Sequence, residues 1–203
     1  MPGGPEGVTV YENEPGESRV SHGDLLLPER DGVADKVRKS YRLFLLISPA
    51  VIILDQITKW VVLKSIPLYG SYPVIEGFFN IVHVRNRGIA FGIMNRPGGS
   101  QITIYILTLV TLAAIFLLFF WFSRLGAGER KTAYGLALVI GGALGNLIDR
   151  IRMGEVVDFL DVHVGTLHWP AFNVADSAIT LGVFWLALTI FFSSGPKGEK
   201  SSK

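Results

Sequence analysis

The chain has 203 residues, of which 49% are hydrophobic and 18% are charged, and its formal net charge is +2. It contains no cysteine, which excludes disulfides, thiol nucleophiles and thiolate metal sites. So small a net charge gives no support for nucleic-acid binding. The four histidines follow no metal-ligand spacing, so we expect neither a metal nor a cofactor.

The first region, residues 1–40, is predicted to be a disordered extension. Up to about residue 35 it is polar and contains many glycines, prolines and acids, a composition that cannot bury a core. It lacks the basic start and apolar stretch of a cleaved signal peptide. A collar of basic residues then precedes the first long apolar run: Lys36, Arg38, Lys39 and Arg42.

Four long apolar runs follow, at about 43–63, 102–122, 132–148 and 175–192. At a rise of about 1.5 Å per residue, each is roughly 25–31 Å long as a helix, close to the ~30 Å hydrocarbon thickness of a bilayer. A soluble protein with buried helices is the alternative, but four such runs leave too little polar surface to cover them. The sequence therefore predicts an α-helical integral membrane protein with four transmembrane helices in one domain, residues 41–193.

The segment at about 68–96, between the first two runs, has a different pattern. Its aromatic and β-branched residues, interrupted by glycine and proline, are typical of strands. We expect a small β-structured segment on the outer membrane surface. Asn86, Gly88 and the residues after them follow the strand-like residues, and the glycines predict a backbone turn or a close approach to a ligand. A turn without a functional role is the alternative.

Charge in the loops predicts the orientation. With four spans, the basic collar, the loop around residues 124–131 and the basic tail at 194–203 all fall on one side. The positive-inside rule makes that side the cytoplasm, so we expect both termini there. The bias is incomplete, because several basic residues fall on the opposite, outer side.

Asp158 and Asp176 lie at the edge of apolar runs, where a carboxylate is costly: about 2.5–3.5 kcal/mol for an Asp at the centre of a membrane helix. With no metal-ligand residues beside them, the two acids indicate proton chemistry. Asn173 and Asp176 lie on one face at the start of the fourth run. For these two residues, a helix cap that satisfies free backbone N–H groups is the alternative interpretation.

The third run ends in a polar patch. Two rows of residues lie side by side there at four-residue spacing: Ala137, Gly141, Gly145 and Asp149, and Gly142, Asn146 and Arg150. The glycines predict close helix packing. Asn146 and Arg150 are candidate functional residues, because they point toward the same boundary as the aspartates. Asp55 and Lys59, spaced i, i+4 in the first run, predict a structural ion pair.

These motifs together resemble the lipoprotein signal peptidases, the signal peptidase II family of bacterial membrane aspartic proteases. The matching stretches occur in the family's order and cover about residues 43–192: Asp55–Lys59, Asn86–Phe91, Gly141–Arg150, Val157–Phe159 and Pro170–Asp176. The resemblance implies that Asp158 and Asp176 are the catalytic pair. It also implies that five residues surround the substrate or support the pair: Asn86, Gly88, Asn146, Arg150 and Asn173. Ile89 departs from the small residue usual at its position.

The resemblance further implies the activity: removal of signal peptides from prolipoproteins, by cleavage before a diacylglyceryl-modified cysteine, in the bacterial inner membrane. We expect a monomer in contact with membrane lipids and the prolipoprotein. Two carboxylates that share one proton can activate water for such a cleavage.

Two other interpretations are a purely structural membrane subunit, which leaves the aspartate pair without a purpose, and a small transporter or proton relay. A relay would use Asp55, Lys59, Asp149, Asp158 and Asp176. It requires acids through the depth of the membrane, whereas the polar groups here gather at one level.

Overall fold

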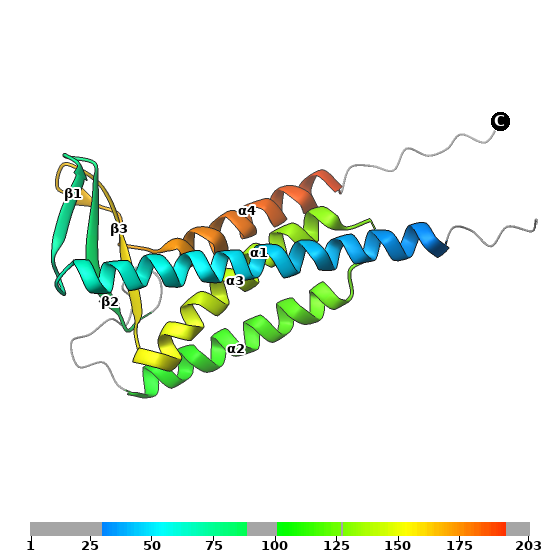
Figure 1. Cartoon of the computed structure of the whole chain (residues 1–203), viewed down its shortest axis with the longest axis horizontal. Helices are drawn as coiled ribbons and strands as arrows, with labels where there is room; N and C mark the ends of the chain where they lie inside the picture. Colours follow the sequence, from blue (N-terminus) through cyan, green and yellow to red (C-terminus); the bar gives the residue numbers. More distant parts are fainter. Residues whose placement is uncertain (1–29, 89–100, 127, 194–203) are drawn as a thin grey trace, which may run out of the picture.

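The computed structural model describes residues 30–88, 101–126 and 128–193. Within them, four long helices run side by side and a small sheet lies at one end of the bundle (Figure 1). The helices are α1 (Arg30–Ser65), α2 (Gln101–Ser123), α3 (Arg130–Met153) and α4 (Val174–Ser193). All four are long and apolar enough to cross a membrane, which confirms the predicted fold class. The predictions for residues 1–29, Ile89–Phe91 and the tail at 194–203 lie outside the described residues.

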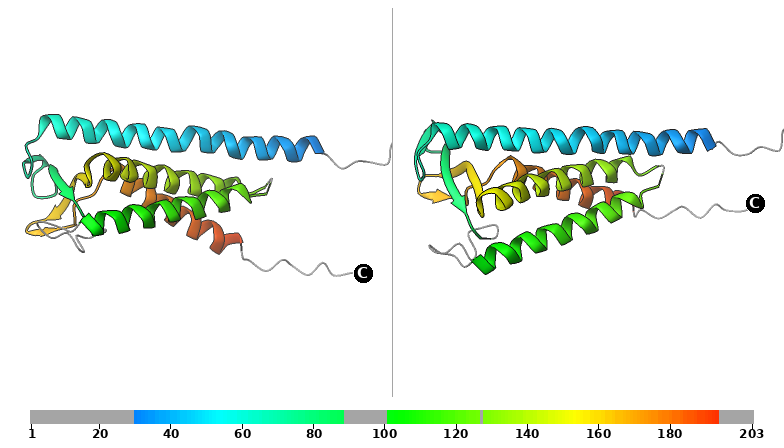
Figure 2. Two further views of the ribbon diagram at one scale, coloured as in Figure 1. Left: turned by 90° about the horizontal axis from the view of Figure 1, so that it is seen from below. Right: turned by 60° about the horizontal axis from the view of Figure 1, so that its bottom comes forward.

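Helix α3 is the centre of the bundle, and the other helices pack around it (Figure 2). Its glycines explain the close packing. A Cβ atom on Gly142 would collide with the carbonyl oxygen of Ala175 in α4, and one on Gly141 would lie 3.0 Å from the backbone of Ser48 in α1. The small residues of α3 therefore let two helices approach its backbone from different sides.

Two helix boundaries differ from the sequence-based expectation. Helix α1 begins at Arg30, so residues 30–40, which the sequence placed in the extension, are helical. Once a helix is nucleated, each further residue adds a hydrogen bond, and the charged residues before the span are good helix formers. Helix α3 continues past residue 148 to Met153, because Arg150 and Arg152 suit its negative C-terminal end and Gly154 then adopts the left-handed conformation that ends it.

The sheet has four antiparallel strands in the order β1-β2-β3-β4: Ser71–Ile75, Phe79–Asn86, Val156–Val164 and Leu167–His168. Strands β1 and β2 fall in the predicted β-structured segment. Strand β3 was not anticipated, and it pairs with β2 from Phe79 opposite Val162 to Asn86 opposite Val156. Strand β3 connects α3 directly to the sheet, and its own side chains Val157 and Phe159 are buried.

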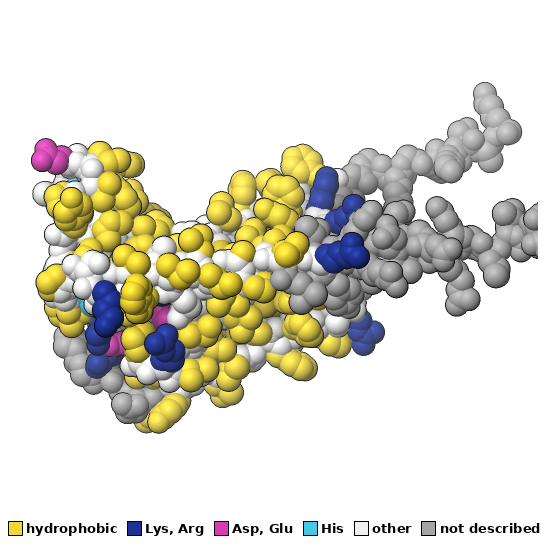
Figure 3. Space-filling model, viewed as in Figure 1, with side chains coloured by type: hydrophobic (Ala, Val, Ile, Leu, Met, Phe, Trp, Pro, Cys, Tyr) yellow, Lys and Arg dark blue, Asp and Glu magenta, His cyan; other side chains and the backbone are white. Residues whose placement is uncertain are grey.

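The surface of the bundle is apolar over most of its length. Figure 3 shows hydrophobic side chains covering the helices, with Lys and Arg gathered toward the two ends. Helix α2 is the clearest case, since residues such as Leu109 and Phe116 are 68% and 70% exposed. A surface of this kind is suited to lipid rather than to water.

Candidate functional site

The predicted site residues meet where the helices join the sheet. Gly154, with φ of 71°, ends α3 and turns the chain into β3, which carries Asp158. A hairpin at the end of β3 then returns the chain to Asn173 at the start of α4. Two chain reversals thus bring three elements that are consecutive in the sequence to one level of the molecule.

Asp158 is nearly fully buried and accepts hydrogen bonds from two amide side chains. Asn173 Nδ2 donates to its Oδ1 at 2.8 Å, and Asn86 Nδ2 donates to its Oδ2 at 3.0 Å. The backbone N–H of Gly88 donates to Asn86 Oδ1 at 2.9 Å, so the Asn86 amide can turn only its NH₂ group toward Asp158. Gly88 therefore acts on the site through its backbone.

Burial raises the pKa of Asp158 from an ordinary value of 3.8 to about 7, and the negative charge of Asp176 adds to this effect. The hydrogen bonds from Asn86 and Asn173 and the positive charge of Lys59 oppose it. Asp158 lies on β3, outside the four membrane-spanning helices. Its carboxyl group can therefore carry or release a proton near neutral pH.

Asp176 and Asn173 form a reciprocal helix cap. The N–H of Asp176 donates to Asn173 Oδ1 at 2.9 Å, and the N–H of Asn173 donates to Asp176 Oδ2 at 3.3 Å. The two residues therefore do cap α4, as the helix-cap interpretation expected. The same two side chains also reach into the site, where Asn146 Nδ2 donates to Asp176 Oδ1 at 2.8 Å.

Lys59 is the centre of a second, charged group. Its Nζ lies 2.8 Å from Asp55 Oδ2 and 2.8 Å from Asp149 Oδ2, and it donates to Asn146 Oδ1 at 2.9 Å. All of these side chains are buried. Asp55 Oδ1 also accepts the N–H of Ala175 in α4 at 2.9 Å, so the ion pair of α1 holds the start of α4.

Asn146 joins the two groups. Its Oδ1 accepts hydrogen bonds from Lys59 and, at 3.2 Å, from Asn173 Nδ2. This leaves its NH₂ group to donate to Asp176. The amide orientation of Asn146 is therefore determined by its partners. Two side-chain hydrogen bonds link Lys59 to Asp176 through Asn146, and three link it to Asp158 through Asn146 and Asn173.

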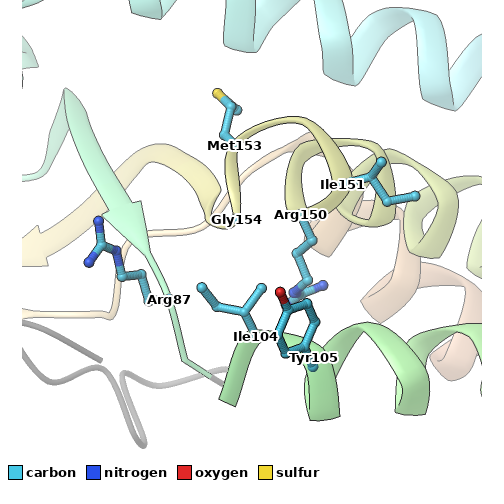
Figure 4. Close-up of a pocket in the computed structure, with 7 residues that line it drawn as sticks. All are labelled: Arg87, Ile104, Tyr105, Arg150, Ile151, Met153 and Gly154. Atoms are coloured by element: carbon cyan, nitrogen blue, oxygen red, sulfur yellow. The ribbon is translucent and has the colours of Figure 1, made fainter. Parts of the chain in front are cut away.

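Arg150 borders a cavity of about 340 Å³ beside the site. Figure 4 shows its guanidinium group reaching from α3 toward the hydroxyl of Tyr105 on α2. The positive charge of Arg150 acts on Asp149, Asp158 and Asp176. The remaining lining residues are Arg87, Ile104, Ile151, Met153 and Gly154. Among the described residues, no group of three or more His, Asp or Glu side chains is arranged to hold a metal ion.

Sequence reasoning missed two polar residues. Gln56 Nε2 donates to Asp149 Oδ1 at 2.9 Å and to Asp55 Oδ2 at 3.2 Å, and so completes the contacts of the charged group. Glu155 is buried and accepts hydrogen bonds from two arginines that flank Asn86. The only signal for Glu155 in the sequence was its place directly before the stretch that carries Asp158.

Comparisons with known proteins all lead to one family. The family model described as Signal peptidase (SPase) II matches residues 47–192. A lipoprotein signal peptidase of Syntrophus aciditrophicus is 46% identical over 154 residues, which cover 75% of this chain and 94% of the relative. One of Geobacter metallireducens is 45% identical over 152 residues, 75% of this chain and 92% of the relative.

A solved bacterial membrane enzyme has the same fold, with a TM-score of 0.65 and 35% sequence identity. The match covers 79% of this chain and 94% of that enzyme. The family model covers α2, α3, most of α4, the second half of α1 and every polar residue of the site described above. This chain therefore belongs to the signal peptidase II family of membrane aspartic proteases.

Proposed function

We propose that Asp158 and Asp176 are the catalytic pair with which this enzyme removes the signal peptides of prolipoproteins, cutting before a diacylglyceryl-modified cysteine. One observation carries the assignment. Asn173 donates hydrogen bonds to both carboxylates: its side-chain amide donates to Asp158, and its backbone N–H donates to Asp176. The two other acids of the network, Asp55 and Asp149, instead form ion pairs with Lys59.

The two carboxylates share one proton. The pKa of Asp158 is raised to about 7, mainly by burial and further by the charge of Asp176. At neutral pH the two groups are therefore not both ionised at the same time. The ionised member takes a proton from a water molecule while the protonated member donates its proton to the scissile carbonyl oxygen. The water oxygen bonds to the carbonyl carbon, which gives a tetrahedral intermediate.

Collapse of that intermediate breaks the carbon–nitrogen bond. The member that protonated the carbonyl oxygen takes that proton back as the C=O bond re-forms, and the other member gives the proton taken from water to the leaving amine. The pair therefore holds one proton at the end of the cycle, as it did at the start. The titration belongs to the two groups together, so either aspartate can be the base in the first step.

The asparagines hold the pair in one geometry. Asn86, Asn146 and Asn173 each donate to a carboxylate oxygen without adding a positive charge beside it. A lysine in the same place would favour the ionised form and hold both groups as carboxylates. Arg150, at the edge of the adjoining cavity, is the group we assign to a backbone carbonyl of the substrate.

The network lies toward the sheet end of the bundle, and the loop with Arg124, Arg130 and Lys131 lies at the opposite end. By the positive-inside rule, we assign the sheet and the aspartate pair to the outer face of the inner membrane and both termini to the cytoplasm. The apolar helix surface then accepts the signal helix and the acyl chains. A monomer suffices, because one chain supplies every residue of the site.

The test is cleavage of a purified diacylglyceryl-modified prolipoprotein by the purified chain. The Asp158→Asn and Asp176→Asn variants are expected to be inactive although folded. If either variant cleaves at the wild-type rate, the assignment of the pair is wrong. The relay alternative has no support: the acids of the four spans are Asp55, Asp149 and Asp176, all in one network.

A further inference from the structure

Glu155 is a buried carboxylate that the mechanism above does not use. It lies between the end of α3 and the first residue of β3. Arg85 Nη1 donates to its Oε1 at 2.6 Å, and Arg87 Nε donates to its Oε2 at 2.9 Å. Its side chain is 6% exposed, whereas those of Arg85 and Arg87 are 37% and 45% exposed. The two arginines thus reach inward from the surface to one buried acid.

Those arginines flank Asn86, which donates to Asp158. Asn86 is the last residue of β2 and lies opposite Val156, while Val84 lies opposite Asp158. Asn86 and Asp158 are therefore diagonal neighbours on one face of the sheet. Because side chains alternate along a strand, Arg85 projects to the other face, where it meets Glu155.

The end of β2 is consequently held from both sides. On one side Asn86 binds Asp158, and on the other Glu155 binds the residues before and after Asn86. Asn86 is the last residue of its strand, so the ladder to β3 does not continue beyond it. A contact from Arg87 supplies the restraint that the ladder lacks at this point.

We propose that Glu155 is a positioning residue for the cleavage reaction, which acts through Arg85 and Arg87 to hold the Asn86 amide against Asp158. The inference rests on the proposed function, in which Asp158 belongs to the catalytic pair. The ion pairs of Glu155 go to Arg85 and Arg87. We expect its effect on the cleavage rate to pass through the position of the Asn86 amide, because Asn86 lies between these arginines and donates to Asp158.

The experiment is a double-mutant cycle with Glu155→Gln and Asn86→Ala, measured by cleavage of a diacylglyceryl-modified prolipoprotein. Glu155→Gln is expected to lower kcat about 10-fold, since a displacement of about 1 Å can cost up to about 10²-fold. KM is expected to change less than kcat. The double variant is expected to be as slow as Asn86→Ala alone, because the amide through which Glu155 acts is already gone.

The pH profile gives a second readout. The hydrogen bond from Asn86 lowers the pKa of Asp158, so its loss moves that pKa upward. Both single variants are expected to shift the pH profile of kcat toward higher pH. If Glu155 served stability alone, Glu155→Gln would leave the pH profile of kcat unchanged, and in the double variant the fold-losses of kcat would multiply. An unchanged profile or multiplied losses would each overturn the proposal.

Two further variants make the experiment decisive. Asp161→Asn removes another buried carboxylate of β3, which binds Asn80 and His168 away from Asn86, and it is expected to leave kcat within about twofold of wild type. If Glu155→Gln does not fold, Arg85→Gln breaks the same contact from its exposed side and is expected to show the same non-additivity. Wild-type activity of Asp158→Asn would refute the proposed function. If Asp158→Asn is inactive but the effects of Glu155→Gln and Asn86→Ala on kcat multiply, only the role of Glu155 is refuted.

Discussion

Two pairs of aspartates lie in one hydrogen-bonded network, and their surroundings differ. Asp55 and Asp149 each contact Lys59 at 2.8 Å and are almost inaccessible to solvent. Asp158 and Asp176 have amide donors instead: Asn86 and Asn173 for the first, Asn146 for the second. The pair beside Lys59 joins α1, α3 and α4, whereas the other pair lies on β3 and at the start of α4.

The comparison distinguishes the two pairs of carboxylates by the charge of their partners. A buried acid beside a cation has a partner of opposite charge that holds it in place, which suits a structural role. A buried acid with neutral donors keeps a fixed position but can still take up a proton. Asn146 serves both pairs with one side chain, since its oxygen faces Lys59 and its nitrogen faces Asp176.

The largest expected effect concerns the pair with neutral donors. Asp158→Asn and Asp176→Asn are each expected to lower the cleavage rate roughly 10²–10⁴-fold, the usual contribution of general acid–base catalysis. Turnover of a lipidated prolipoprotein by purified enzyme measures this. Asp55→Asn is the matched variant in the other pair, and it is expected to lower the yield of folded protein more than the turnover per folded molecule. The comparison is broken if Asp55→Asn gives normal yield without turnover.

The next effect concerns the charged pair. Lys59→Met removes the cation between two buried carboxylates and is expected to cost about 3–5 kcal/mol of stability. Thermal unfolding of the purified protein measures the loss. Adding Asp55→Asn and Asp149→Asn to Lys59→Met is expected to recover part of it, because the uncompensated charges disappear. A Lys59→Met protein as stable as wild type at pH 7 would contradict the structural role.

A steric change at the junction gives a smaller effect. Gly142→Ala places a methyl group against the carbonyl oxygen of Ala175, so α3 and α4 must separate. We expect a loss of about 1–3 kcal/mol, the usual cost of overpacking, with reduced turnover because Asn146 moves away from Asp176. Gly128→Ala is the control, since nothing lies within 4 Å of the added atom. Equal unfolding temperatures for the two variants would disprove the prediction.

The smallest effect is a pH dependence of stability. The pKa of Asp158 rises from 3.8 to about 7 on folding, so the folded state is favoured while this group is protonated and loses that advantage as pH rises through this range. Asp158→Asn cannot titrate there. Its unfolding temperature relative to wild type is therefore expected to increase by a few degrees between about pH 5 and pH 8. A difference that stays constant with pH would show that Asp158 does not titrate there.

Much of the helical part was predictable from local patterns. Four apolar runs of the length of a bilayer predict four helices, because every backbone polar group in lipid must be satisfied within its own segment. The end of α3 was less predictable. Asp149 and Arg150 suggested the membrane boundary, but a helix that is packed between two others continues until Gly154 ends it.

Strand β3 could not be recognised from its own residues. Asp158, Asp161 and His163 interrupt its apolar pattern, and its partner β2 lies about seventy residues earlier in the chain. Only the pairing of two distant segments gives those residues strand geometry and brings Asn86 beside Asp158. The contact of Glu155 with Arg85 and Arg87 depends on the same pairing.

By itself, the sequence determined the class of the molecule and indicated Asp158 and Asp176 as the candidate pair, because apolar length and residue type are local properties of a chain. The tertiary structure alone decided which carboxylates form ion pairs with Lys59 and which accept hydrogen bonds from asparagine side chains. That division depends on distances between α1, α3, β3 and α4, and no spacing along the chain encodes it.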